Sequence, residues 1–178
     1  PTDTLYGLAA DAFSLPALER IFTIKNRPTE MSVPLLVSCW DHLELVTGYL
    51  PEAANKLVKR FWPGPLTLVL PKAKELPDWV TGGRDTVAVR MPNHQVALEI
   101  IRRLDRPVTG TSANRSGQQD LLDYNAIKAV LGQDVDHIVE TGPPPQGTPS
   151  TVIDLTTNLP KLLRQGALSM NQILGEIG

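Results

Sequence analysis

Stretches with apolar side chains at every second position alternate along this chain with longer stretches of helical spacing. Residues 85–92, Asp-Thr-Val-Ala-Val-Arg-Met-Pro, place Val87, Val89 and Met91 on one side of an extended chain, which is the period of a β-strand. Residues 94–104 predict a helix, and the apolar face expected for it consists of Ala97, Ile100, Ile101 and Leu104. Because the two patterns alternate without an internal repeat, the fold class is α/β or α+β, built around a mixed sheet.

The other elements follow from the same patterns. Strands are expected at residues 33–40, 66–70, 107–114, 136–140, 150–155 and 161–164. Helices are expected at residues 14–25, 41–46, 51–61 and 124–132, and residues 171–177 close the chain. Ser14 and Asp41 are expected to cap the helices that they begin. Pro28 should end the first helix, because it pushes Arg27 toward extended geometry. Residues 62–65, Trp-Pro-Gly-Pro, predict a rigid turn.

Length, charge and cysteine content narrow the functional classes. The 178 residues suit a single domain over 1–178, and the net charge of −2 argues against a general nucleic-acid coat or a membrane-surface protein. The single cysteine, Cys39, cannot form an internal disulfide, and no apolar run approaches the ~20 residues of a membrane span. We therefore expect a cytoplasmic protein. Since the chain begins at Pro1 and not at Met, we also expect an upstream segment to be missing.

Four polar clusters lie at the ends of predicted strands or helices, where α/β proteins build their sites. They occupy residues 1–4, 25–27, 111–117 and 149–166. Their side chains are hydroxyls, amides and fixed cations. The three histidines, His42, His94 and His137, have no motif around them and read as solvated or capping residues. Neither a P-loop nor a Gly-x-Gly-x-x-Gly sequence is present.

Each cluster taken alone has two interpretations. Lys25 and Arg27 form either a solvated helix tip or an anion clamp. Arg90, within an apolar strand, either extends to water or meets a carboxylate or phosphate in a pocket, and Arg164 has the same two possibilities. The polar residues that are either turn and strand formers or ligand contacts are Ser112, Asn114, Ser150 and Thr151.

Taken together and in order, the clusters resemble the YrdC/TsaC family of threonylcarbamoyl-AMP synthases. The matching segments are PTDTLYGL, KNRP, WPGPLTLVL, DTVAVRMP, TSANRSG, STVIDL and LLRQG, which run from residue 1 to about 166. The resemblance implies that L-threonine, bicarbonate and ATP give threonylcarbamoyl-adenylate and pyrophosphate. It also implies a twisted mixed sheet with flanking helices around a concave, positively charged cavity. A downstream transferase complex would pass the group to tRNA, so that contact with tRNA is indirect.

The resemblance assigns roles to individual residues. Lys25 and Arg27 would be the catalytic pair, and the ATP-binding residues would be Lys25, Arg27, Thr86, Ser112, Asn114 and Arg164. The residues on the threonine side would be Thr4, Ser38, Arg90 and Ser150. Arginines suit this chemistry because their planar forks hold phosphate or carboxylate with two hydrogen bonds. Mg²⁺ would accompany the nucleotide, without a dedicated metal site.

Departures from the family pattern and two rival functions complete the prediction. Residues 28–34 supply Met31 and Ser32 where relatives commonly have Asn or Lys, and Ser38 stands where many have His. Residues 118–123, QQDLLD, replace the usual Ser-Pro-Thr run. The longer family forms carry a further C-terminal domain, which we expect to be lacking here. The rivals are a carbamoyl-adenylate-forming domain of the hydrogenase-maturation type and a non-catalytic RNA-binding module.

Overall fold

Two sheets of unequal size form the framework of the computed structural model, which describes residues 1–177. The strands are β1 (Gly7–Leu8), β2 (Leu35–Leu36), β3 (Leu66–Pro71), β4 (Thr86–Arg90), β5 (Val108–Thr109), β6 (Thr111–Ser112), β7 (Thr151–Asp154) and β8 (Lys161–Arg164). The larger sheet has the order β5-β2-β4-β3-β7-β8, and β1 pairs with β6 in a separate antiparallel ribbon.

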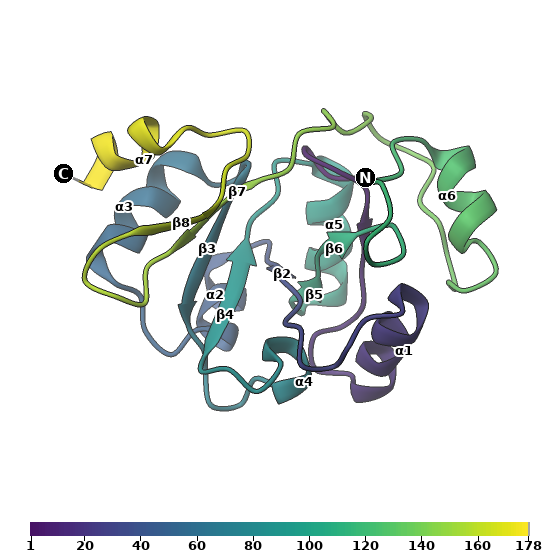
Figure 1. The fold of residues 1–178 in the computed structure, drawn as a ribbon, viewed down its shortest axis with the longest axis horizontal. Coiled ribbons are helices and arrows are strands. Elements are labelled where there is room, and N and C mark those ends of the chain that lie inside the picture. Colours follow the sequence, from purple (N-terminus) through teal and green to yellow (C-terminus); the bar gives the residue numbers. More distant parts are fainter. Residues whose placement is uncertain (178) are drawn as a thin grey trace.

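Helices flank both ends of the larger sheet. They are α1 (Leu15–Lys25), α2 (Trp40–Val46), α3 (Glu52–Phe61), α4 (Asp78–Thr81), α5 (Gln95–Leu104), α6 (Tyr124–Leu131) and α7 (Met170–Ile177). Figure 1 shows α3 and α7 at one end of the molecule and α1 and α6 at the other, while the segment from α6 to β7 crosses between them. None of the helices within residues 1–177 is long and apolar enough to cross a membrane.

The larger sheet is mixed, as the alternation of sequence patterns predicted. β2 runs parallel to β4, and β3 runs parallel to β7, whereas the β3–β4, β2–β5 and β7–β8 pairs are antiparallel. Leu68 pairs with Val89 and Leu66 with Thr151. The carboxyl end of β4 therefore meets the amino ends of β3 and β7 at one edge of the sheet, which is formed by the ends of these strands and not by an outer strand. Arg90, Thr67 and Ser150 all lie at this edge.

The helices contribute to two hydrophobic clusters, and a helix packs either one or two of its faces into them. In α3, the spacing of Ala54, Leu57 and Val58 puts all three side chains in the core. In α1, Phe22 packs into the main core while Ile24 faces a smaller cluster shared with α6. By holding both clusters, α1 fixes the position of its carboxyl end, where Lys25 and Arg27 follow.

Several local predictions were wrong. Residues 136–140 do not form a strand, since Val135 and Ile138 pack on the smaller cluster and the segment has no strand beside it to complete a ladder. Cys39, not Asp41, is the N-cap residue of α2, and Asp41 lies in the first turn. On α5, Leu98 and Ile101 are the buried residues, while Ile100 and Leu104 are exposed.

Other local features agree with the predictions or add to them. Ser14 occupies the N-cap position of α1 without a side-chain capping hydrogen bond, and the helix ends at Lys25 through Asn26 in the left-handed region. His94 caps α5, as one of its two interpretations required. The strand β1 and the short helix α4 were not anticipated.

Candidate active site

A cavity of about 530 Å³ opens at the edge of the larger sheet where β4 ends. The residues around it come from the start of the chain, the segment after α1, β4, β6, the segment just before β7, and strands β7 and β8. The predicted site residues that line it are Thr4, Arg27, Arg90, Ser112, Ser150 and Arg164. Three guanidinium groups from distant parts of the sequence therefore share one concave space.

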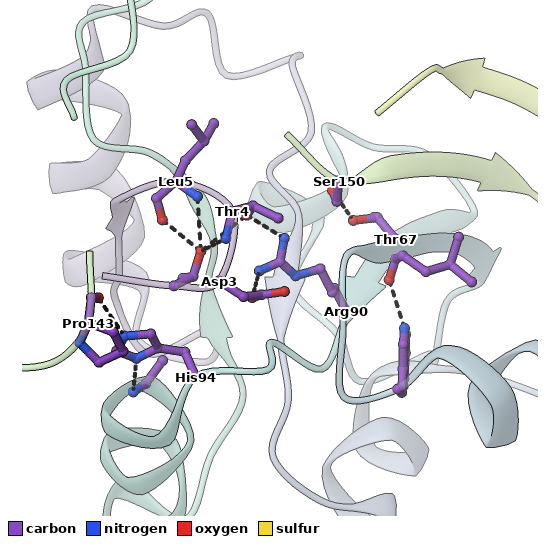
Figure 2. Close-up of polar contacts among 12 residues, drawn as sticks. Asp3, Thr4, Leu5, Thr67, Arg90, His94, Pro143 and Ser150 are labelled. Atoms are coloured by element: carbon purple, nitrogen blue, oxygen red, sulfur yellow. Dashed lines mark hydrogen bonds and ion pairs between the residues drawn. The ribbon is translucent and has the colours of Figure 1, made fainter. Parts of the chain in front are cut away.

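Arg90 is buried at this edge and meets a carboxylate, which excludes the alternative that it extends to water (Figure 2). Its Nη2 donates to Asp3 Oδ1 at 2.6 Å, and its Nη1 donates to Thr4 Oγ1 at 2.6 Å. Its Nε has no hydrogen-bond partner among the described residues. Burial lowers the pKa of Arg90, and the neighbouring Asp3 carboxylate opposes that shift. The guanidinium is thus held rigidly with donor capacity to spare.

Ser150 is positioned by side chains on both sides of it. Its Oγ shares a 2.7 Å hydrogen bond with Thr67 Oγ1 from β3, which lies beside Arg90 in Figure 2. Arg164 Nη2 donates to Ser150 O at 2.8 Å and to Ser150 Oγ at 3.0 Å. Burial lowers the pKa of Arg164, and the charge of Asp120 opposes this. The hydroxyl of Ser150 and the fork of Arg164 consequently face the cavity as a pair.

Lys25 points inward and not to solvent, with a relative exposure of 1%. Its Nζ donates to Ser112 O at 2.6 Å, to Asn114 O at 2.8 Å and to Asn114 Oδ1 at 2.9 Å. Three acceptors match the three donors of an ammonium group. Lys25 and Asn114 are not among the residues that line the cavity. They brace the loop after β6 from behind and set the position of Ser112.

Arg27 reaches the same cavity because the chain turns sharply after α1. Asn26 has φ 49°, and the Arg27 amide donates to Phe22 O at 3.0 Å. Arg27 Nη2 donates to Ser32 O at 2.7 Å, whereas its buried Nε has no partner within residues 1–177. Burial lowers the pKa of Arg27. A guanidinium so placed is partly desolvated and has free donors for an anion.

The segment that joins α6 to β7 contributes Pro149 and Ser150 to the wall of the cavity. Gly147 N donates to Thr4 O at 2.9 Å. His94 Nδ1 accepts from Ala97 N, so its Nε2 carries the proton and donates to Pro143 O at 3.1 Å (Figure 2). His94 therefore links the start of α5 to a segment that lies about fifty residues later in the sequence. These bonds hold residues 3–4 against Arg90.

Besides Lys25 and Asn114, two further predicted residues do not line the cavity. Thr86 is the first residue of β4 and pairs with Pro71, four residues before Arg90. At about 3.3 Å per residue it is roughly 13 Å from the edge of the sheet that holds the site. Ser38 is buried after β2, where its Oγ meets His42 Nδ1 at 3.3 Å. Neither residue is among those that line the cavity.

Three residues of the site were not singled out from the sequence. Asp3 was visible within the Pro-Thr-Asp-Thr motif, but only the structure shows its carboxylate on Arg90. Thr67 lies inside an apolar strand with no signal beyond its alternating position. Asp120 lines the cavity and falls in the stretch that departs from the family pattern.

The charge of Lys25 is the basis of a prediction about stability. Burial, with a smaller effect from Arg27, lowers the pKa of Lys25 to about 8 from 10.5, and Asp120 opposes the shift. Between these two values the unfolded chain binds more protons than the folded one, so folding becomes more favourable as pH rises through that window. We expect the free energy of unfolding of the wild type, relative to Lys25→Met, to increase between pH 8 and 10.5 and to stay level below pH 7.5.

Urea titrations of both proteins at closely spaced pH values measure this difference. Lys74→Met removes an exposed lysine and controls for the loss of a charge. A difference between wild type and Lys25→Met that falls as pH rises contradicts the prediction.

Comparison with known proteins assigns the chain to a family. The family model named Sua5_yciO_yrdC, described as telomere recombination, matches residues 1–166. The chain belongs to the Sua5/YciO/YrdC family. A threonylcarbamoyl-AMP synthase from Pyrococcus abyssi is 43% identical over the whole chain, which covers 52% of that protein. A putative threonylcarbamoyl-AMP synthase from Mycobacterium leprae is 38% identical, also over the whole chain, which covers 80% of that protein.

A solved structure of a Sua5/YciO/YrdC family member agrees with the fold. P. abyssi Sua5 complexed with L-threonine has a TM-score of 0.94 at 43% identity, over 99% of this chain and 53% of that one. The chain therefore spans about half the length of its first curated relatives.

Proposed function

We propose that this chain forms threonylcarbamoyl-adenylate and pyrophosphate from L-threonine, bicarbonate and ATP. The observation that carries the proposal is the convergence of Arg27, Arg90 and Arg164 with hydroxyl groups on one cavity. Its similarity to a family member that was crystallised with L-threonine supports an amino acid as one ligand. A cavity of about 530 Å³ is within the usual range for small-molecule sites.

The phosphate side of the site is assigned to Arg27 and Arg164, with Ser112 beside them. Transfer of an adenylyl group places negative charge on phosphate oxygens, so that catalysis depends on positioning and on electrostatic stabilisation more than on covalent participation. Lys25 and Asn114 support this side by fixing the loop that carries Ser112. A single well-placed donor in such a site contributes about 2.7–4 kcal/mol to transition-state stabilisation.

The amino-acid side is assigned to Arg90, Thr4 and Ser150. The guanidinium of Arg90 and the two hydroxyl groups line the cavity and offer donors and acceptors for a small, polar, zwitterionic ligand. Asp3 keeps the buried guanidinium neutralised before the ligand arrives. Threonine that binds here would have its carboxylate within reach of Arg90, and its carbamate would face the phosphates held by Arg27 and Arg164. Thr86 and Ser38 have no part in this assignment because of where they lie.

Mg²⁺ is proposed to enter with the nucleotide. The described residues contain no cluster of three His, Cys, Asp or Glu side chains placed to hold a metal ion, and the cavity is predominantly cationic. This donor set suits phosphate oxygens, while Mg²⁺ keeps water and phosphate ligands and needs few from the protein. We further propose a cytoplasmic nucleotidyltransferase that hands its product to a transferase complex acting on tRNA.

The proposal is tested by incubating the protein with ATP and bicarbonate and measuring pyrophosphate with and without L-threonine. We expect release that depends on threonine. Release that depends instead on carbamoyl phosphate would favour the carbamoyl-adenylate function. Salt-sensitive RNA binding without ATP turnover would favour an RNA-binding module.

A further inference from the structure

One carboxylate stands among the cations of the cavity. Of the described residues that line it, Asp120 alone carries a carboxylate. It belongs to the stretch 118–123, which follows the loop that Lys25 braces. Its charge acts on both sides of the phosphate region, since it opposes the lowering of the pKa of Lys25 and of Arg164.

Asn114 holds Asp120 in this position. Asn114 Nδ2 donates to Gln118 O at 2.7 Å and to Asp120 Oδ1 at 3.2 Å, while Asn114 Oδ1 accepts from Lys25 Nζ at 2.9 Å. Gly117, with φ 79°, allows the chain to turn back toward Asn114. The carboxylate is therefore fixed to the same braced loop as Ser112.

Of the three arginines that line the cavity, two have no carboxylate partner within the described chain. Arg90 is paired with Asp3. Arg164 donates only to Ser150, and Arg27 donates only to Ser32 O, with its Nε unpartnered within residues 1–177. Two partly desolvated guanidinium groups thus line the cavity together with a single carboxylate, that of Asp120, and a bound anion would enter the field of all three groups.

We propose that Asp120 is an internal competitor for the phosphate groups of the nucleotide: its carboxylate partly neutralises the cations around the cavity and thereby weakens the binding of an anionic ligand. The inference rests on the nucleotide-binding part of the proposed function. The Coulomb repulsion between Asp120 and a ligand grows with the charge of the ligand. Asp120 therefore sets nucleotide affinity according to the number of phosphate groups.

The test is the affinity of wild type and Asp120→Asn for ATP, ADP, AMP and adenosine, measured by titration calorimetry without threonine or bicarbonate. Asparagine keeps an oxygen for the contact with Asn114 and removes the charge. We expect Asp120→Asn to bind metal-free ATP about tenfold more tightly, ADP and AMP by progressively smaller factors, and adenosine unchanged. The gain should shrink at high salt, because exposed charges are screened.

Two further variants sharpen the result. Asp120→Glu keeps the charge and should bind ATP like the wild type. Glu75→Gln removes one exposed negative charge beyond the opposite end of β3 and should change nothing. Thermal unfolding checks that each variant is folded.

Equal ATP affinity in wild type and Asp120→Asn would overturn the inference. So would a variant that binds Mg·ATP more weakly and metal-free ATP equally, because Asp120 would then be a ligand of the metal. A wild-type chain that binds ATP as expected but releases no threonine-dependent pyrophosphate would lose the proposed synthesis and keep the inference.

Discussion

Arg27→Ala is expected to reduce threonine-dependent ATP consumption at least about a hundredfold while the fold stays intact. Removing one preorganised donor from a developing oxyanion typically costs a factor of about 10²–10³ in rate. Arg27 is partly desolvated and lines the cavity, and only its Nη2 donates to the described chain, so its Nη1 is available to phosphate. Its one hydrogen bond to the protein, at Ser32 O, contributes little to folding. Pyrophosphate release and circular dichroism measure the two outcomes.

Two substitutions serve as controls for Arg27→Ala. Arg27→Lys keeps the charge and loses the planar fork, so it should recover only part of the activity. Arg84→Ala removes an exposed arginine before β4, at the end of the strand away from the site, and should be fully active. Full activity in Arg27→Ala would remove the phosphate role from this residue.

Gly166→Ala is expected to destabilise the fold by about 3 kcal/mol, at the upper end of the usual cost of overpacking. A Cβ at this position would lie 2.3 Å from Pro149 O, 2.4 Å from Ser150 C and 2.5 Å from Thr151 N. All three are backbone atoms, so no side-chain rotation relieves the clash. The Gly166 amide also donates to Thr151 Oγ1 at 3.0 Å, which brings the end of β8 against the start of β7. Separating these segments would pull Arg164 away from Ser150.

Gly166→Ala should therefore lower both the free energy of unfolding, measured in urea, and the affinity for ATP. The matched control is Gly175→Ala in α7, where an added Cβ meets nothing within 4 Å. Alanine in a helix interior is favoured over glycine by about 0.8–1 kcal/mol, so this variant should be slightly more stable than the wild type. Wild-type stability in Gly166→Ala would show that the close approach of these segments is not required.

Patterns within single segments were reliable where the buried face of an element was unambiguous. The alternation at Val87 and Val89 and the apolar spacing of α3 both led to the elements that the structure contains. Such patterns were unreliable where apolar side chains lie on more than one face of a helix, because the pattern then does not show which face is buried. On α5, Ile100 appeared equivalent to Ile101, but the neighbours of the helix leave Ile100 exposed. The strand expected at 136–140 failed because an extended segment needs a partner strand, and sequence periodicity does not show whether one is near.

The candidate site, too, was predicted in part from the sequence and in part only from the tertiary structure. Residue types and local motifs were enough to select Arg27, Arg90 and Arg164 as cations with two possible roles each. Only the tertiary structure excluded the solvated alternative for Arg90 and Lys25, and it separated Thr86 and Ser38 from the cavity. The deciding contacts join residues 86 to 89 positions apart, such as Arg90 with Thr4 and Lys25 with Asn114.

The sequence by itself determined the class of the fold, the chemistry of the side chains and the family, because period, turn residues and motifs are local properties of the chain. The tertiary structure alone decided which of those side chains meet. Strand order and direction bring the end of β4 to the starts of β3 and β7, and such non-local pairing depends on how the whole core packs.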